Sequence, residues 1–376
     1  MLRLFGLIAF LVALLPHCLA AQSAPPDEPR VSLSGYLQPQ YESHTLDGET
    51  TDRAHFRRLV VGLEATVSNA WAVEFQVDAG PIASGDDDRL TVKDAHLQYR
   101  GWEDHGILLT IGNQKMPFSR ALLGSSSRRG LVERPVTGDR SLGSPGRALA
   151  IRTEGWHRRR TLYWSAAVAS SRQSPDADEI RVDGITEADE GWNQGPLVGG
   201  RVEVHPLGEI PRAHGDFDRG PLRFTLAAGA YGWWNDHDVE QGPDRADAER
   251  VTGFEMSGAL RARGLSVDAE FEHIVSRAVD PRLDRGLYSA GRAALDKASL
   301  EAGYMLVPRR LEALFGFDIA DAAVFAEPVR RPSGGVNVYV RGHSLKFSLM
   351  HRETFNERGA RGARSRTTYV QAQFSF

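Results

Sequence analysis

The sequence predicts an all-β chain that closes into a transmembrane antiparallel barrel of about sixteen strands, within a range of sixteen to eighteen. Three observations support this prediction. Apolar and polar residues alternate along nearly the whole chain after residue 20, which is the period of a strand between two environments. Many alternating segments run for about ten residues, the length that a tilted strand needs to cross a bilayer. Short turns and long polar segments separate them, the layout of a barrel with its loops at one end.

Alternation is clearest in seven segments: 59–67, 71–78, 222–231, 265–272, 336–341, 345–350 and 369–376. A soluble β-sandwich alternates as well, but its strands are about half as long. The apolar faces here also bear almost no charge, as contact with lipid requires. Only a closed barrel lets such strands pair all their backbone groups in lipid, and a barrel of this width is expected to enclose water.

Two further features fit the barrel. Six tryptophans near expected strand ends should form an aromatic girdle at the headgroup level: Trp71, Trp102, Trp156, Trp192, Trp233 and Trp234. Four long connections rich in glycine, proline and aspartate are expected to project from one end: 80–88, 171–195, 235–250 and 352–366.

The first twenty residues have the pattern of a secretory signal. Arg3 precedes the apolar run Leu4–Leu15, and Cys18-Leu19-Ala20 allows cleavage before Ala21, so residues 1–20 are expected to be a signal peptide and 21–376 one barrel domain. A lipoprotein signal at Cys18 is the alternative. Cys18 is the only cysteine of the 376 residues, which excludes a disulfide framework.

Composition excludes two other classes. The net charge of −4 argues against a nucleic-acid partner. No long apolar run follows the signal, which excludes a helical membrane protein.

One block is more specific than periodicity. Residues 111–119 read Ile-Gly-Asn-Gln-Lys-Met-Pro-Phe-Ser, and the segments Leu122–Ser126 and Leu131–Pro135 follow. This block resembles the phosphate-selective porin O/P family. The resemblance implies an outer-membrane channel of sixteen strands, usually a homotrimer, with a loop folded inward as a constriction. It also implies small anions as substrates, phosphate or polyphosphate among them, contact with outer-membrane lipid, and no cofactor.

The best candidate for the inward loop is 119–146. We expect pore-lining, anion-binding roles for five of its cationic residues or their neighbours: Lys115, Arg120, Arg128, Arg129 and Arg134. A basic ring at a narrow point concentrates anions, and guanidinium groups donate paired hydrogen bonds to phosphate. Arg128 and Arg129 should point to opposite sides in an extended segment. The alternative is that these arginines form a solvated surface loop.

A non-selective diffusion porin is the second hypothesis, because the lumen also has acidic residues. Asp268, Glu270 and Glu272 share one strand face, and we expect them to form a charge ladder with Arg261 and Arg263 of the preceding strand. A cross-strand ladder of this kind would weaken anion selectivity.

Two alternatives come from other classes. A hydrolase barrel would need serine and histidine side chains together, and His343 and Ser344 lie on opposite faces of their strand; no catalytic motif occurs, so we expect no enzyme. A barrel plugged by its own loops would not conduct. The acidic loops 86–88 and 236–238 could bind a divalent cation but are expected to be hydrated loops without metal.

Overall fold

The computed structural model describes residues 30–376 apart from 87–89, 158–159, 238 and 240–244. The expected signal peptide, residues 1–20, lies outside this part of the chain, as do Asp87, Asp88 and Asp238 of the two acidic loops. In the part that is described, no helix is both long and apolar enough to cross a membrane.

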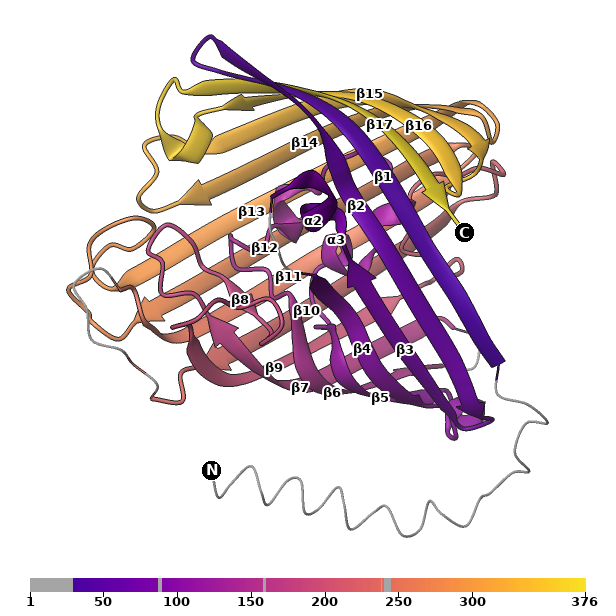
Figure 1. Ribbon diagram of the computed structural model, residues 1–376, viewed down its shortest axis with the longest axis horizontal. Coiled ribbons are helices and arrows are strands. Elements are labelled where there is room, and N and C mark those ends of the chain that lie inside the picture. The colour runs from indigo at the N-terminus through magenta and orange to yellow at the C-terminus, as the bar shows by residue number, and fades with distance from the viewer. Residues whose placement is uncertain (1–29, 87–89, 158–159, 238, 240–244) are drawn as a thin grey trace.

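Nearly all regular structure is β-sheet (Figure 1). The strands are β1 (Arg30–Leu46), β2 (Glu49–Ser68), β3 (Trp71–Asp78), β4 (Thr91–Tyr99), β5 (Ile107–Lys115), β6 (Arg147–Trp156), β7 (Leu162–Gln173), β8 (Val182–Asp183), β9 (Asn193–Val204), β10 (Arg223–Trp234), β11 (Ala248–Ala262), β12 (Leu265–Ala278), β13 (Arg292–Val307), β14 (Leu311–Ala322), β15 (Val329–Arg341), β16 (Leu345–Phe355) and β17 (Arg364–Ser375). Short helices are α2 (Gly80–Ser84), α3 (Arg120–Leu123), η2 (Glu103–His105), η3 (Ser126–Arg128), η4 (Val136–Gly138) and η5 (Glu357–Gly359).

The sheet closes on itself. Each long strand pairs antiparallel with the next one in sequence, β7 pairs directly with β9, and β1 pairs with both β2 and β17. The two-residue β8 adds only to the end of β7. Among the described residues, sixteen long strands therefore form the ring, which confirms the predicted antiparallel barrel.

Side chains alternate between lipid and lumen as the sequence predicts. Along β12 the side chains of Leu265 and Phe271 are exposed on the outer face, whereas those of Glu270 and Glu272 are buried inside. Charged residues return to the outer face towards one rim, where His273 Nδ1 lies 2.8 Å from Asp296 Oδ1. This boundary marks the edge of the apolar belt that faces lipid.

The two ends of the barrel differ. Both the start of β1 and the end of β17 lie at the end with mostly short turns, such as Ser68–Trp71 and Arg263-Gly264. Short turns and chain ends on one side mark the periplasmic end of such barrels. The long connections 79–90, 116–146, 174–192, 235–247 and 279–291 lie at the other end.

The girdle prediction is right for some tryptophans and wrong for two. Trp71 and Trp102 flank Tyr99 near the short-turn end, with ring centroids 4.7 and 5.1 Å from it. Trp234 is exposed on the outer face, but its neighbour Trp233 is fully buried inside the barrel. Trp192 is also buried, and its ring packs under the Arg181 guanidinium at 5.2 Å. Adjacent strand residues face opposite sides, so a Trp-Trp pair cannot place both rings in lipid.

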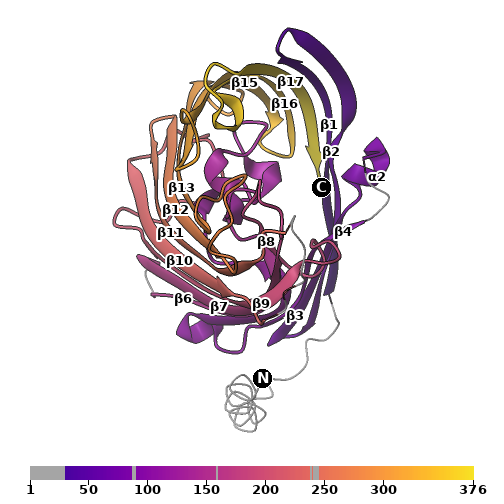
Figure 2. The same ribbon diagram turned by 90° about the vertical axis from the view of Figure 1, so that its left-hand side faces the viewer.

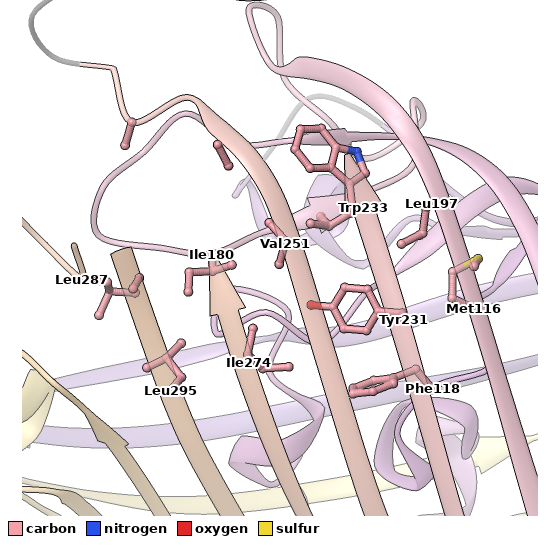
Figure 3. Packing of buried hydrophobic residues seen from close by; sticks show 14 of the residues in the cluster. Met116, Phe118, Ile180, Leu197, Tyr231, Trp233, Val251, Ile274, Leu287 and Leu295 are labelled. Atoms are coloured by element: carbon pink, nitrogen blue, oxygen red, sulfur yellow. The ribbon is translucent and has the colours of Figure 1, made fainter. Parts of the chain in front are cut away.

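The lumen is partly packed, which corrects the expectation of a purely water-filled interior. An apolar cluster covers the inner faces of β9 to β13 towards the long-loop end (Figure 3). Its largest members include Met116, Phe118, Ile180, Tyr231, Trp233, Ile274 and Leu295. The Phe118 and Tyr231 rings meet edge to face with centroids 4.9 Å apart. Connections 116–146 and 174–192 supply apolar side chains that pack on the inner faces of these strands and bury them.

Phe118 should therefore be an anchor for the connection that follows it. We expect Phe118→Ala to lower the free energy of unfolding by about 3–5 kcal/mol, because it leaves a cavity under Tyr231. Urea unfolding in lipid vesicles measures this change. Phe118→Leu, the matched control, should lose much less, and equal losses for the two variants would contradict the anchoring role.

Candidate functional site

The connection 116–146 leaves β5, crosses the inside of the barrel and returns to β6. Figure 2 looks into the barrel and shows the magenta turns of this segment within the ring of strands, whereas α2 lies outside the ring. Its inward course begins at Met116 and Phe118, which are buried in the apolar cluster. Ser119 then adopts a positive φ of 58° and caps α3 by accepting the Leu122 N–H at 3.2 Å. The Lys-Met-Pro-Phe-Ser sequence thus turns the chain into the lumen.

Acidic residues of β12 hold the first turn of this segment. Arg120 Nε lies 2.8 Å from Asp268 Oδ1. The backbone N–H groups of Arg120 and Ala121 donate to the Glu270 carboxylate at 2.8 and 3.0 Å. Arg120 is consequently buried and neutralised, which makes it an anchor for the segment.

The end of the segment is fixed to the same wall by a buried ion pair. Lys297 Nζ of β13 lies 2.6 Å from Glu272 Oε2 of β12, and both side chains are fully buried. Ser144 donates to Glu272 at 2.7 Å and accepts from Lys297 at 2.7 Å. The hydroxyl therefore contacts both members of the ion pair.

The middle of the segment reaches other strands. Arg129 lies 3.5 Å from Glu301 of β13, and its carbonyl oxygen accepts from Lys346 of β16 at 2.6 Å. Glu133 accepts two hydrogen bonds from Arg57 of β2 at 2.7 and 2.9 Å. Burial alone would raise the pKa of Glu133, but the Arg57 charge and its hydrogen bonds hold the pKa at about 2. The segment is tied to opposite sides of the ring.

The other three predicted residues have a different environment. Within the described part of the chain, Lys115, Arg128 and Arg134 have no carboxylate partner at ion-pair distance. Lys115 Nζ donates to the carbonyl oxygens of Leu123 and Gly124, both at 3.0 Å. Arg128 is exposed and Arg129 is not, as expected for neighbours that point apart.

Arg134 belongs to a group of positive charges near the long-loop end of β2 to β6. Burial, and then the charges of Arg129, Arg58, Arg140 and Arg147, hold the pKa of Arg134 well below its usual range. On the adjoining wall, Arg58 and Lys93 share the single carboxylate of Asp78 at 3.5 and 3.6 Å. Arg147 forms a bidentate ion pair with Asp94, with hydrogen bonds of 3.1 and 3.0 Å. Cations outnumber carboxylates in this group, which we call the basic wall: Arg58, Lys93, Lys115, Arg134, Arg147, Asp78 and Asp94.

A cavity of about 470 Å³ opens towards the short-turn end. Its walls come from β6, β7, the end of β9, connection 116–146 and residues 205–212. Most of its arginines are paired: Arg152 with Glu154 at 3.1 Å, Arg160 with Glu209 at 3.3 Å, and Arg212 with Glu203. Arg128 lines the cavity without such a pair. The basic wall and this cavity lie on the same side of the lumen, away from the acidic strands β12 and β13.

The predicted charge ladder forms only in part. Arg261 of β11 pairs with Asp268 at 2.7 Å. Glu270 and Glu272 instead serve connection 116–146 and Lys297. Arg263 lies in the β11–β12 turn with a φ of 51° and contributes no rung. Within the described residues, no group of three or more His, Cys, Asp and Glu side chains is placed to hold a metal ion.

Sequence reasoning missed a second inserted segment, 205–222, between β9 and β10. His214 of this segment lies 3.0 Å from Asp268 and 3.1 Å from Glu301. His343 Nε2 lies 2.9 Å from the His214 carbonyl oxygen, and its ring packs on Phe217, so it is part of this contact. The sequence did contain a signal for this segment. Once the strands are counted in order, a long stretch rich in proline and glycine falls at the end of the barrel where the turns should be short.

Sixteen strands, an inserted loop and a lumen with charged walls define a barrel of the outer-membrane porin class. The family model for phosphate-selective porin O and P matches residues 36–184, which confirms the resemblance of residues 111–135 and fits a location in the outer membrane. A comparison with curated proteins found no match.

Solved porins share the fold. An anion-selective porin from Comamonas acidovorans superposes with a TM-score of 0.60 at 12% identity, covering 93% of this chain and all of that one. The outer-membrane channel DcaP of Acinetobacter baumannii gives 0.59 at 12% identity, with 94% and 99% covered. OmpT of Vibrio cholerae in its trimer form gives 0.57 at 13% identity, with 93% and 100% covered. These identities establish the fold alone.

The Lys297–Glu272 pair predicts a large single-variant effect. Lys297→Met leaves a buried carboxylate without its cation and should lower the free energy of unfolding by about 3–5 kcal/mol. The double variant Lys297→Met/Glu272→Leu should recover most of that loss in the same urea titration. A double variant as unstable as the single one would show that the pair is not what stabilises this wall.

His214 predicts a loss of stability in alkali. Burial alone would lower its pKa, but the carboxylates of Asp268 and Glu301 raise the pKa to about 9. A histidine with a raised pKa stabilises the fold fully when the pH is below its ordinary pKa of about 6.5. This stabilisation is lost as the pH rises through about 9. The other charged groups that face these carboxylates are the guanidinium groups of Arg120, Arg129 and Arg261.

The measurement is the difference in unfolding free energy between the wild type and His214→Gln at pH 7 and pH 10. This difference should shrink at pH 10. His214→Arg, which keeps its charge, should hold a constant advantage over His214→Gln. If the difference in unfolding free energy between the wild type and His214→Gln is the same at both pH values, the raised pKa of His214 is contradicted.

Proposed function

We propose that this protein is a passive outer-membrane channel for small anions, with phosphate or polyphosphate as the substrate class. The observation that supports it most directly is the basic wall, where five cationic side chains face two carboxylates. A surplus of positive charge in a wet, narrow lumen raises the local anion concentration and repels cations. No chemical step is part of this role.

Three residues have the leading roles in this proposal. Lys115 and Arg134 belong to the basic wall, and Arg128 lies at the cavity towards the short-turn end. An anion would pass between the basic wall and this cavity along β2 to β7. Guanidinium groups that lack a carboxylate partner are free to donate to phosphate oxygens. Arg120 and Arg129, whose charges are matched, hold the connection that narrows the lumen.

A general diffusion porin is the second candidate, and a specific observation favours it. The large cavity is lined by Glu154, Glu203 and Glu209 as well as by arginines. Matched charges there would let neutral and zwitterionic solutes through. The two candidates differ in whether phosphate binds on its way.

Assembly as a homotrimer in outer-membrane lipid is also part of the proposal. It rests on the family resemblance and on the barrel of OmpT, which was solved in a trimer form. Chemical cross-linking of the protein in native outer membranes tests it. Trimer-sized bands are expected, and monomer alone would refute this part.

Single-channel recording in a planar bilayer with a KCl gradient tests the proposed function. We expect a reversal potential on the anion side and a chloride current that added phosphate blocks. Arg128→Gln, Arg134→Gln and Lys115→Gln should each lower the anion preference by about fivefold, since one charge in a wet lumen contributes on the order of 1 kcal/mol.

Arg361→Gln is the matched control. Arg361 is 76% exposed in the β16–β17 connection and pairs with Glu327 at 3.3 Å, outside the lumen, so its loss should leave selectivity unchanged. Open channels without anion preference or phosphate block would leave the general diffusion porin. A folded barrel without any conductance would refute both candidates and favour a plugged, non-conducting barrel.

A further inference from the structure

The connection 205–222 is out of place for its end of the barrel. It joins β9 to β10 at the end where β11 and β12 are joined by Arg263-Gly264 alone. A loop at this end would be expected to be short. Instead of projecting into solvent, it folds inward, and Ile210 and Asp216 are buried.

This connection runs along the mouth from β7 to the β15–β16 turn. Near its start, Arg212 pairs with Glu203 of β9 and lies 5.2 Å from the ring centroid of Tyr163 on β7. Near its end, Phe217 meets the Tyr339 ring edge to face at 4.8 Å. Asp216 accepts the backbone N–H of Gly264 at 2.7 Å. Contacts at both ends make it a strap across one side of the opening.

The strap binds the other inserted segment directly. The backbone N–H of His214 donates to the Arg128 carbonyl oxygen at 2.9 Å, and the Arg120 side chain donates to the Pro211 carbonyl oxygen at 3.2 Å. The two segments also share acceptors: Asp268 pairs with both Arg120 and His214, and Glu301 with both Arg129 and His214. Moving the strap therefore loosens the wall contacts of connection 116–146.

Most of these contacts are polar, and the backbone has flexible points. Gly208 and Gly215 have φ values of 103° and 91°, which glycine adopts without strain. The Glu209–Arg160 pair is 47% and 62% exposed and exchanges with water at small net cost, whereas the His214 contacts are buried and hold the strap in place. Such a segment can move as a unit about its ends.

We propose that residues 205–222, the mouth strap, form a displaceable gate that sets the width of the periplasmic exit. The inference rests on the channel function proposed above. Strap residues Glu209 and Arg212 line the 470 Å³ cavity opposite β6 and β7, so the exit lies between the strap and that wall. His214, held between Asp268 and Glu301, is the latch.

The first experiment removes the strap. Residues 207–219 are replaced by a short glycine-serine turn, and unit conductance is recorded in KCl. A wider exit should raise the conductance by about twofold or more. The matched control replaces residues 357–362 at the other end, which should leave conductance near that of the wild type. A folded deletion variant with wild-type conductance would overturn the gate.

The second experiment locks the strap without deleting it. A Cβ built on Gly130 lies 3.1 Å from His214 Cγ, so Gly130→Cys/His214→Cys brings two sulfurs within disulfide reach. Cys18, the only natural cysteine, is in the predicted signal peptide and does not compete. Reduction of the cross-linked barrel should raise its conductance, and His214→Cys alone should not respond to the reductant. An intact cross-link whose reduction changes nothing would overturn the gate.

The outcomes separate the two proposals. A wild-type channel whose conductance neither variant changes refutes the strap as a gate and leaves the channel function standing. A silent wild type with a conducting deletion variant supports the gate. Silence in the wild type and in the folded deletion variant refutes the channel function and the gate with it.

Discussion

The structure depends on one constraint: in lipid, every backbone donor and acceptor must find a partner within the protein. Pairing of β1 with both β2 and β17 removes the last free edge. Irregular backbone is then tolerated only at the rims or inside the ring. Connections 116–146 and 205–222 use the inside, where side chains of the wall satisfy their polar groups. The closed ring thus makes an inserted pore lining possible.

The interior is divided by charge and by packing. Acidic strands β12 and β13 hold both inserted segments through Asp268, Glu270 and Glu301, and the apolar cluster fills the adjoining space. The opposite strands, β2 to β6, hold the surplus of cations. One inserted segment therefore has structural arginines on one side, Arg120 and Arg129, and an arginine without a matching carboxylate, Arg134, on the other.

Sequence reasoning predicts the wall well because a strand between lipid and lumen leaves a period of two in its residues. The family resemblance of the Lys115–Pro135 block also pointed to an inward loop at 119–146, which lies within connection 116–146. Sequence reasoning fails where neighbouring chain segments decide the environment. Trp233 is buried within the apolar cluster that inserted residues such as Met116 and Ile180 complete, and the pairing of Arg120 with Asp268 joins residues far apart in sequence. Connection 205–222 was missed because it is unusual only in being long at the short-turn end of the barrel. Which end it occupies becomes clear only when all the strands have been counted.

The anchors of connection 116–146 have a consequence for the order of folding. The connection lies in the first half of the chain, but its partners Asp268, Lys346 and Asn337 lie in the second, up to 217 residues away. Closing such long loops is slow because of its entropic cost. The lining must therefore settle late, after β12 to β16 have formed around it. A nascent barrel would be wider and more hydrated than the mature one, and the lining becomes ordered in the last step of assembly.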